Sequence, residues 1–151
     1  RPEFEYRPQY RRLPVTVSHF RVAYTVEDFD RMIGFFRDGL GLEPGELWTD
    51  NGRGQMFFAG EASLEIFEPA YAAAVDQIEA GGRVSGQIRF AFQVGEINQA
   101  LERAIQHGAT LVKGPVLTPW NDLNARIESP EGLQITLFQV SPDSPPADNK
   151  P

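Results

Sequence analysis

The sequence lacks cysteine altogether and has only two histidines, His19 and His107, in 151 residues. Without cysteine the protein has no disulfide bonds, no thiolate metal site and no cysteine nucleophile. Two histidines are too few for a zinc site built mainly from imidazoles. Thiol chemistry and an imidazole-rich zinc site are therefore excluded by composition.

Basic side chains are also scarce. The chain has 14 Lys and Arg against 21 Asp and Glu, which gives a formal net charge of -7 and an isoelectric point near 4.8. Such a chain has no net cationic field with which to displace counterions from a phosphate backbone, so a nucleic-acid partner is not expected. No apolar run approaches the roughly 18 residues of a transmembrane helix, and the first residues lack the apolar core of a signal peptide. We expect a cytosolic protein with no membrane partner.

The two ends of the chain differ in composition from the rest. Residues 1–14 contain three prolines and four arginines, which favours an extended arm. Residues 141–151 contain four prolines and no large apolar side chain, which is typical of a disordered tail. The folded body is therefore expected within about residues 15–140.

This body contains an internal duplication. A shift of 68 positions places residues 21–28 (RVAYTVED) on residues 89–96 (RFAFQVGE), and a shift of 71 places residues 64–67 on residues 135–138. After the first match, apolar residues recur at helical spacing on one face in both copies. Each copy therefore begins with a strand, continues with a helix and ends with further strands.

Alternation and turn residues define the expected elements. The first copy, residues 15–69, has a strand over 16–26, a helix from about 28 to 37 and strands over 46–50, 55–59 and 62–68. The second, residues 87–140, has a strand over 87–94, a helix over 96–107 and strands over 109–113, 123–128 and 133–140. A linker over 70–86 contains a short helix near 71–79. The sequence thus predicts an α+β fold of two tandem βαβββ modules.

Each first strand has one apolar face, which should meet the helix, and one mixed face. If the two curved sheets join about a pseudo-twofold axis, the mixed faces line a common cleft. Arg21, Glu65, Arg89 and Thr136 then occupy repeat-related positions inside it.

Two segments resemble a known family. Residues 21–42 (RVAYTVEDFDRMIGFFRDGLGL) and 113–138 (KGPVLTPWNDLNARIESPEGLQITLF) resemble the vicinal oxygen chelate superfamily, which includes glyoxalase I, bleomycin-resistance proteins and extradiol dioxygenases. The second segment is similar to the family's ending, in which a proline-tryptophan loop, a strand, a Pro-acidic-Gly turn and a final strand follow one another. The resemblance covers about residues 15–140. It implies a curved, partly open sheet with helices on the outside, and a homodimer.

The resemblance also implies where a metal ion would bind. Metal-dependent members carry one ligand on the first strand and one on the last strand of each module, which maps onto Arg21, Glu65, Arg89 and Thr136. Only Glu65 is a plausible ligand, because a protonated guanidinium has no lone pair to offer. His19 lies on the same face two residues before Arg21, about 6–7 Å along the strand from the expected ligand position. One His and one Glu fall short of three protein ligands, so we expect no cofactor and keep a metal ion as the disfavoured alternative.

Two interpretations of the charged residues remain open. Glu65 could pair with Arg21 and Arg89 in a structural cluster that fills the cavity. Alternatively the cluster is only partly neutralised, and its surplus positive charge favours a carboxylate, phosphate or enolate ligand. Thr136 is a hydrogen-bonding side chain at the fourth position. The predicted ligand-binding residues are Arg21, Arg89, Thr136 and His19, together with the aromatic residues Phe67, Trp120 and Phe138, which could stack on a planar ligand.

These observations support three classes of function. The first is a metal-independent binding protein for an anionic or aromatic small molecule. The second is an enzyme, a lyase, isomerase or dioxygenase, with Glu65 as general base or metal ligand and an arginine stabilising an enolate or oxyanion. The third is an interaction module in which the duplicated fold serves only for pairing.

Overall fold

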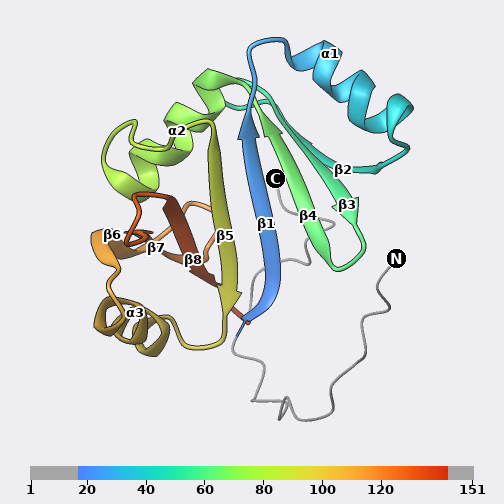
Figure 1. Ribbon diagram of the computed structural model, residues 1–151. Helices are drawn as coiled ribbons and strands as arrows, with labels where there is room; N and C mark the ends of the chain where they lie inside the picture. Colours follow the sequence, from blue (N-terminus) through green and yellow to red (C-terminus); the bar gives the residue numbers. More distant parts are fainter. Residues whose placement is uncertain (1–16, 143–151) are drawn as a thin grey trace.

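The protein folds around one eight-stranded mixed sheet with the strand order β2-β3-β4-β1-β5-β8-β7-β6 (Figure 1). The structure is a computed structural model that describes residues 17–142. The first module comprises β1 (Val17–Thr25), α1 (Phe29–Gly34) with a π-helical continuation (Phe35–Gly39), β2 (Glu43–Trp48), β3 (Gly54–Ala59) and β4 (Ala62–Phe67). After α2 (Pro69–Ala80), the second comprises β5 (Ile88–Val94), α3 (Ile97–Gln106), β6 (Thr110–Leu117), β7 (Leu123–Glu128) and β8 (Gln134–Gln139).

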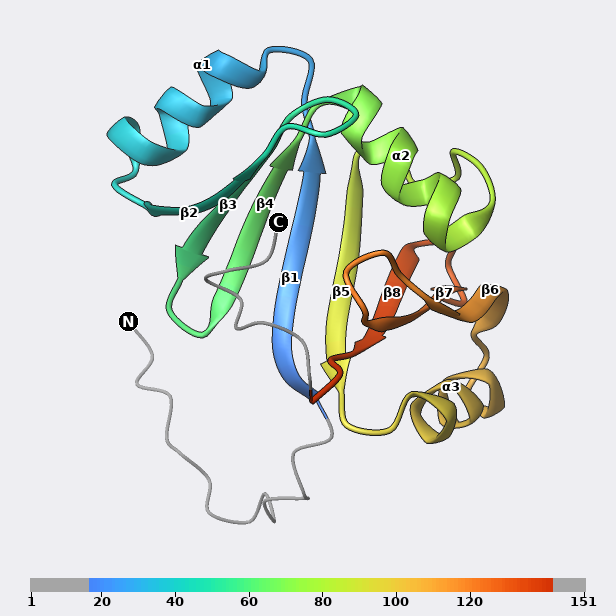
Figure 2. The same ribbon diagram turned by 180° about the vertical axis from the view of Figure 1, so that it is seen from behind.

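The strand pairing confirms the predicted α+β fold of two βαβββ modules. In each module the first strand runs parallel to the last, β1 with β4 and β5 with β8. The modules join through antiparallel pairing of β1 with β5, in which Arg21 lies opposite Ala91 and Ala23 lies opposite Arg89 (Figure 2). This reciprocal register is what a pseudo-twofold axis between two equivalent strands requires.

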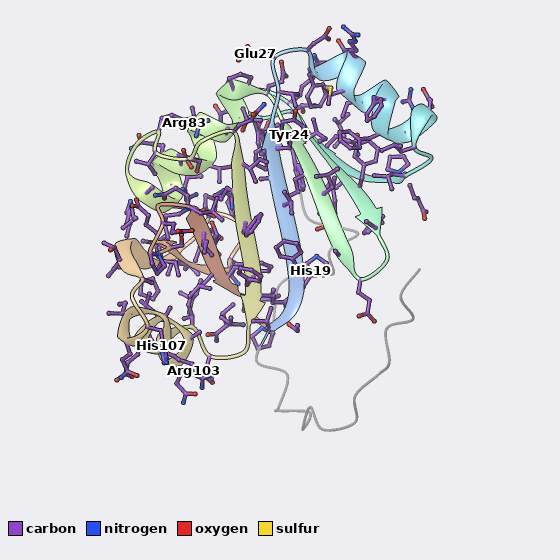
Figure 3. The ribbon with its side chains drawn as sticks, in the orientation of Figure 1. His19, Tyr24, Glu27, Arg83, Arg103 and His107 are labelled. Carbon is purple, nitrogen blue, oxygen red and sulfur yellow. The ribbon has the colours of Figure 1, made fainter. Side chains whose placement is uncertain are left out.

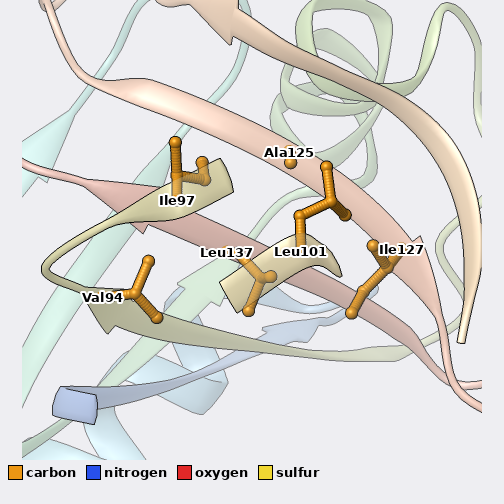
Figure 4. Packing of buried hydrophobic residues seen from close by; sticks show 6 residues of the cluster. All are labelled: Val94, Ile97, Leu101, Ala125, Ile127 and Leu137. Carbon is orange, nitrogen blue, oxygen red and sulfur yellow. The ribbon is translucent and has the colours of Figure 1, made fainter. Parts of the chain in front are cut away.

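Helices α1 and α3 cover the apolar face of their own modules. Helix α1 packs on a cluster that contains Val26, Phe29, Phe57 and Ile66. Helix α3 packs on a second cluster, shown in Figure 4, of Val94, Ile97, Leu101, Ala125, Ile127 and Leu137. Asp28 begins α1, because its carboxylate accepts a hydrogen bond from the Arg31 backbone N–H at 3.2 Å.

Helix α2 behaves differently from the other two. It was expected as a short linker helix on the outside of the fold, but it runs for 12 residues and packs against β4, β6 and β7 on the mixed face of the sheet. Pro69 begins the helix, and Gly81, with a left-handed φ of 78°, ends it. The turn between β2 and β3 touches its first residues: a Cβ on Gly52 would lie 2.8 Å from the Tyr71 backbone nitrogen.

Two strand boundaries differ from the expected ones because of proline and glycine. Strand β2 begins at Glu43 and includes Pro44, which an edge strand tolerates since it pairs on one side only. Strand β6 continues through Gly114 and Pro115 to Leu117, with a register shift between Lys113 and Val116. The expected arm over 1–14 and most of the expected tail over 141–151 lie outside the described residues.

No helix within residues 17–142 combines the length and the apolar character needed to cross a membrane. The homodimer and the cytosolic setting stay predictions.

Candidate functional site

A cleft opens on the mixed face of the sheet, between the two modules and α2. It contains about 630 Å³ of space unfilled by protein atoms, part of it open to solvent. All the predicted site residues except His19 line this cleft. Strand register explains why they gather there: Glu65 lies beside Ala23, and Thr136 lies beside Ala91, so small side chains on the central strands leave room between the larger ones.

His19 does not line the cleft. It lies on β1 nearer the start of the strand (Figure 3), and its Nε2 is 3.0 Å from the Ser63 hydroxyl. Burial, together with the charge of Arg21, lowers the pKa of the His19 imidazole below its ordinary value. The ring is therefore neutral at pH 7 and hydrogen-bonded within the protein.

The second module fills its half of the cleft with a buried charge network. The guanidinium of Arg126 is fully buried and donates to Asp76 at 2.8 Å and to Glu79 at 2.5 Å, both on α2. Thr136 donates its hydroxyl hydrogen to Glu79 at 2.7 Å and accepts a hydrogen bond from Arg89 at 2.8 Å. The network therefore joins α2 to β5, β7 and β8.

Both carboxylates of this network are ionised. Burial alone would raise the pKa of Glu79, but the charges of Arg89 and Arg126 and the hydrogen bonds from Thr136 and Arg126 hold that pKa below its usual value. Burial also opposes ionisation of Asp76, yet hydrogen bonds from Ser85 and from arginine side chains lower its pKa. Glu79 thus carries a negative charge that is bonded to Arg126 and also acts on Arg89.

This arrangement differs from the structural ion-pair cluster considered from the sequence. Within residues 17–142 no salt bridge joins Glu65 to Arg21 or to Arg89. Arg89 instead bonds to Thr136 and lies in the field of Glu79. The sequence did contain a signal for the network. Strand alternation places Arg126 on the mixed face, between the buried Ala125 and Ile127 of the apolar face.

Arg21 has no comparable partner. This half-buried side chain makes no hydrogen bond within residues 17–142, and its Nε is buried and unsatisfied. Its guanidinium lies 4.7 Å from the centroid of the Phe138 ring, a cation–π geometry. Arg21 lines the cleft, and its guanidinium has donors but no acceptor, so it suits a ligand that accepts hydrogen bonds.

Glu65 likewise lacks a hydrogen-bond or salt-bridge partner within residues 17–142. Its side chain lines the cleft and the residue is 8% exposed, yet no hydrogen bond or ion pair from residues 17–142 reaches it. Within residues 17–142, the cleft therefore presents a cation, Arg21, and an anion, Glu65, that have neither a hydrogen bond nor a salt bridge.

Aromatic side chains form one wall of the cleft. The rings of Trp48 and Tyr71 stack at 5.8 Å between centroids, and Phe67 contacts Tyr71 at 4.7 Å. Tyr71 was missed from the sequence because it belongs to the linker helix. Burial, together with the charge of Glu65, raises the pKa of the Tyr71 phenol above its ordinary value, so the hydroxyl keeps its proton. Phe138 and Trp120 line the side contributed by the second module.

Comparison with known proteins places this architecture in a family. A model of the Glyoxalase/Bleomycin resistance protein/Dioxygenase superfamily matches residues 17–137, and the chain belongs to that superfamily. No curated protein sequence matches the chain.

Solved structures share the fold at low sequence identity. A superfamily member from Vibrio splendidus 12B01 is 13% identical with a TM-score of 0.58, over 80% of this chain and 97% of that one. Methylmalonyl-CoA epimerase from Mycobacterium tuberculosis is 20% identical with a TM-score of 0.56, over 84% and 89%. A hypothetical protein from Bacillus halodurans C-125 is 16% identical with a TM-score of 0.57, over 86% and 97%. At these identities the likeness concerns the fold alone.

The residues of the cleft do not fit the superfamily's metal site. Arginine occupies the position of the first-strand ligand in both modules, and a guanidinium does not coordinate a metal. No group of three or more His, Cys, Asp or Glu side chains in the described part of the chain, residues 17–142, is arranged to hold a metal ion. The usual metal ligands are therefore lacking.

Arg126, which is bonded within the buried network, and Arg21, which is not, should contribute differently to the free energy of unfolding. We expect Arg126→Gln to lower the free energy of unfolding by about 3–5 kcal/mol, because it leaves two carboxylates without their buried partner. We expect Arg21→Gln to change it by no more than about 0.5 kcal/mol, since no protein hydrogen bond is lost. Urea unfolding at pH 7 measures both, with the exposed Arg31→Gln as matched control. A loss for Arg21→Gln as large as that for Arg126→Gln would contradict this assignment.

The same network predicts sensitivity to acid. The pKa of Asp76 is lower in the folded than in the unfolded protein. Below about pH 5 the unfolded chain therefore binds more protons than the folded one, and the free energy of unfolding decreases as the pH is lowered. Asp76→Asn should be less stable than the parent at pH 7, and its free energy of unfolding should fall less steeply between pH 5 and pH 3. Urea titrations across this range test the slope, and parallel slopes for the two proteins would argue against an ionised Asp76.

Proposed function

We propose that the protein binds an anionic or aromatic small molecule in this cleft without a metal ion. The observation that carries the proposal is the state of Arg21. The buried Nε of Arg21 has no acceptor within residues 17–142, which costs free energy unless another group bonds to it, and the place of Arg21 in the cleft makes the side chain available to a ligand.

The remaining lining supports the same function. Trp48, Phe67 and Tyr71 offer an aromatic wall for a planar group, and the Phe138 ring contacts the Arg21 guanidinium. The cavity volume to compare with other binding sites is about 90 Å³, below the roughly 300–1,000 Å³ typical of sites for drug-sized ligands, so we expect a small ligand that extends toward the open side of the cleft. A few polar groups among aromatic side chains are the usual composition of such a site.

A second candidate function is acid–base catalysis by Glu65. The observation that favours it is a buried carboxylate facing the cleft with no hydrogen bond from the described residues, 17–142. Such a group can accept a proton from a bound carbon acid, and an arginine can stabilise the resulting enolate. Tyr71, whose phenol keeps its proton, could donate a hydrogen bond to the same intermediate.

One experiment separates the two functions. We expect 3-phenylpropionate to bind with one-to-one stoichiometry in calorimetry and to be recovered without deuterium at its carbon 2 after incubation in D₂O. Arg21→Gln should weaken binding at least ~10-fold because a charge-assisted contact is lost.

Arg31→Gln, an exposed and matched change, should bind as the parent does. If the parent protein introduces deuterium at carbon 2 of 3-phenylpropionate and Glu65→Gln does not, acid–base catalysis by Glu65 replaces simple binding as the function. Equal affinity for Arg21→Gln and the parent would contradict the proposed binding mode.

A further inference from the structure

The cleft contains two unpaired charges of opposite sign on neighbouring strands. Arg21 of β1 lies opposite Ser63 of β4, and Glu65 follows two residues later on the same face. Strand geometry places their Cα atoms about 8 Å apart. A direct salt bridge would ordinarily form between long side chains at this separation, so its absence among the described residues, 17–142, needs a physical reason.

The reason lies in the packing of Arg21. Its guanidinium lies over the Phe138 ring of β8, on the side of the second module, whereas Glu65 lies on the side of the first. Between them the central strands carry Ala23 and Ala91, whose methyl groups fill little of the space. The two charges therefore face a shared gap instead of each other.

The other charged groups of the cleft have hydrogen-bond partners within residues 17–142, and Arg89 lies in the field of Glu79. Glu79 accepts hydrogen bonds from Arg126, Thr136 and Asn124, and Arg89 donates to Thr136. A ligand entering the cleft thus meets Arg21 and Glu65 as groups that still need partners.

We infer that the cleft is built for a zwitterionic aromatic molecule, with a carboxylate bonded to Arg21 and an ammonium or amino group bonded to Glu65. This inference rests on the proposed function and narrows its ligand class. A simple anion would satisfy Arg21 but leave Glu65 buried and unpaired. A neutral molecule would leave both charges uncompensated. An α-amino acid with an aromatic side chain is the simplest molecule that carries both groups.

The aromatic wall lies where the ring of such a ligand would extend. Phe67 follows Glu65 by two residues on β4 and points to the same face, and Tyr71 and Trp48 pack beside it. A ligand whose amino group meets Glu65 therefore has this wall within reach of its side chain. Stacking on these rings would add affinity without opposing either charge contact.

Calorimetry with three related probes tests the inference. L-phenylalanine carries both charged groups, 3-phenylpropionate lacks the amine, and 2-phenylethylamine lacks the carboxylate. We expect one equivalent of L-phenylalanine to bind at least ~10-fold more tightly than either analogue, because each analogue leaves one charge of the cleft unpaired.

Two variants should divide the effect between the ends of the ligand. Arg21→Gln should weaken the binding of L-phenylalanine and 3-phenylpropionate at least ~10-fold and leave 2-phenylethylamine within about twofold. Glu65→Gln should weaken the binding of L-phenylalanine and 2-phenylethylamine at least ~10-fold and leave 3-phenylpropionate within about twofold. Arg31→Gln and Glu61→Gln, two exposed and matched changes, should have no effect, and Arg21→Lys, which keeps the charge, should retain part of the affinity for both acids.

The outcomes also separate this inference from the proposed function. If 3-phenylpropionate binds as tightly as L-phenylalanine, and Arg21→Gln weakens both, the cleft binds aromatic anions and the zwitterion assignment is wrong. If none of the three probes binds at millimolar concentration, the proposed function and this inference both fail. A Glu65→Gln variant that folds normally and binds L-phenylalanine as the parent does would overturn the inference alone.

Discussion

The buried guanidinium of Arg126 is the group on which the rest of the cleft depends. Its hydrogen bonds to Asp76 and Glu79 attach helix α2 to the mixed face of the sheet, where Ala72 of the helix also packs against Phe67. That position brings Tyr71 to the aromatic wall and brings the charge of Glu79 to Arg89. Because removal of a buried partner leaves its counter-charges unpaired, the attachment is stable only as a complete network.

This attachment makes the two halves of a duplicated fold unequal. Arg21 and Arg89 occupy equivalent positions on the first strands, and Glu65 and Thr136 occupy equivalent positions on the last ones. In the second half the linker helix supplies the partners, so Arg89 is part of the structure. In the first half α2 contributes apolar and aromatic side chains, and no hydrogen bond or salt bridge from residues 17–142 reaches Arg21 or Glu65. One linker helix thus gives equivalent residues different surroundings, and the binding role of Arg21 and Glu65 is our proposal.

Much of this could be predicted from the sequence, and the remainder has identifiable physical causes. The duplication and the alternation of strand residues predict the two modules and place Arg21, Glu65, Arg89 and Thr136 on one face, because both depend on local periodicity. The position of α2 could not be predicted in this way, since periodicity shows that a helix forms but not which surface it packs on. For the same reason the sequence left open whether Glu65 pairs with the arginines, because Glu79, the carboxylate that acts on Arg89, belongs to that helix.

The central claim is that an organic ligand replaces a metal ion in the cleft, and metal content tests it most directly. Untagged protein purified without chelators should contain no stoichiometric metal by inductively coupled plasma mass spectrometry, before and after incubation with nickel, zinc, manganese or iron followed by removal of the free ion. Two features predict this result: arginine stands at both first-strand positions, and no group of three or more His, Cys, Asp or Glu side chains within residues 17–142 could hold a metal ion. Close to one equivalent of any of these metals, lost in Glu65→Gln, would contradict the account.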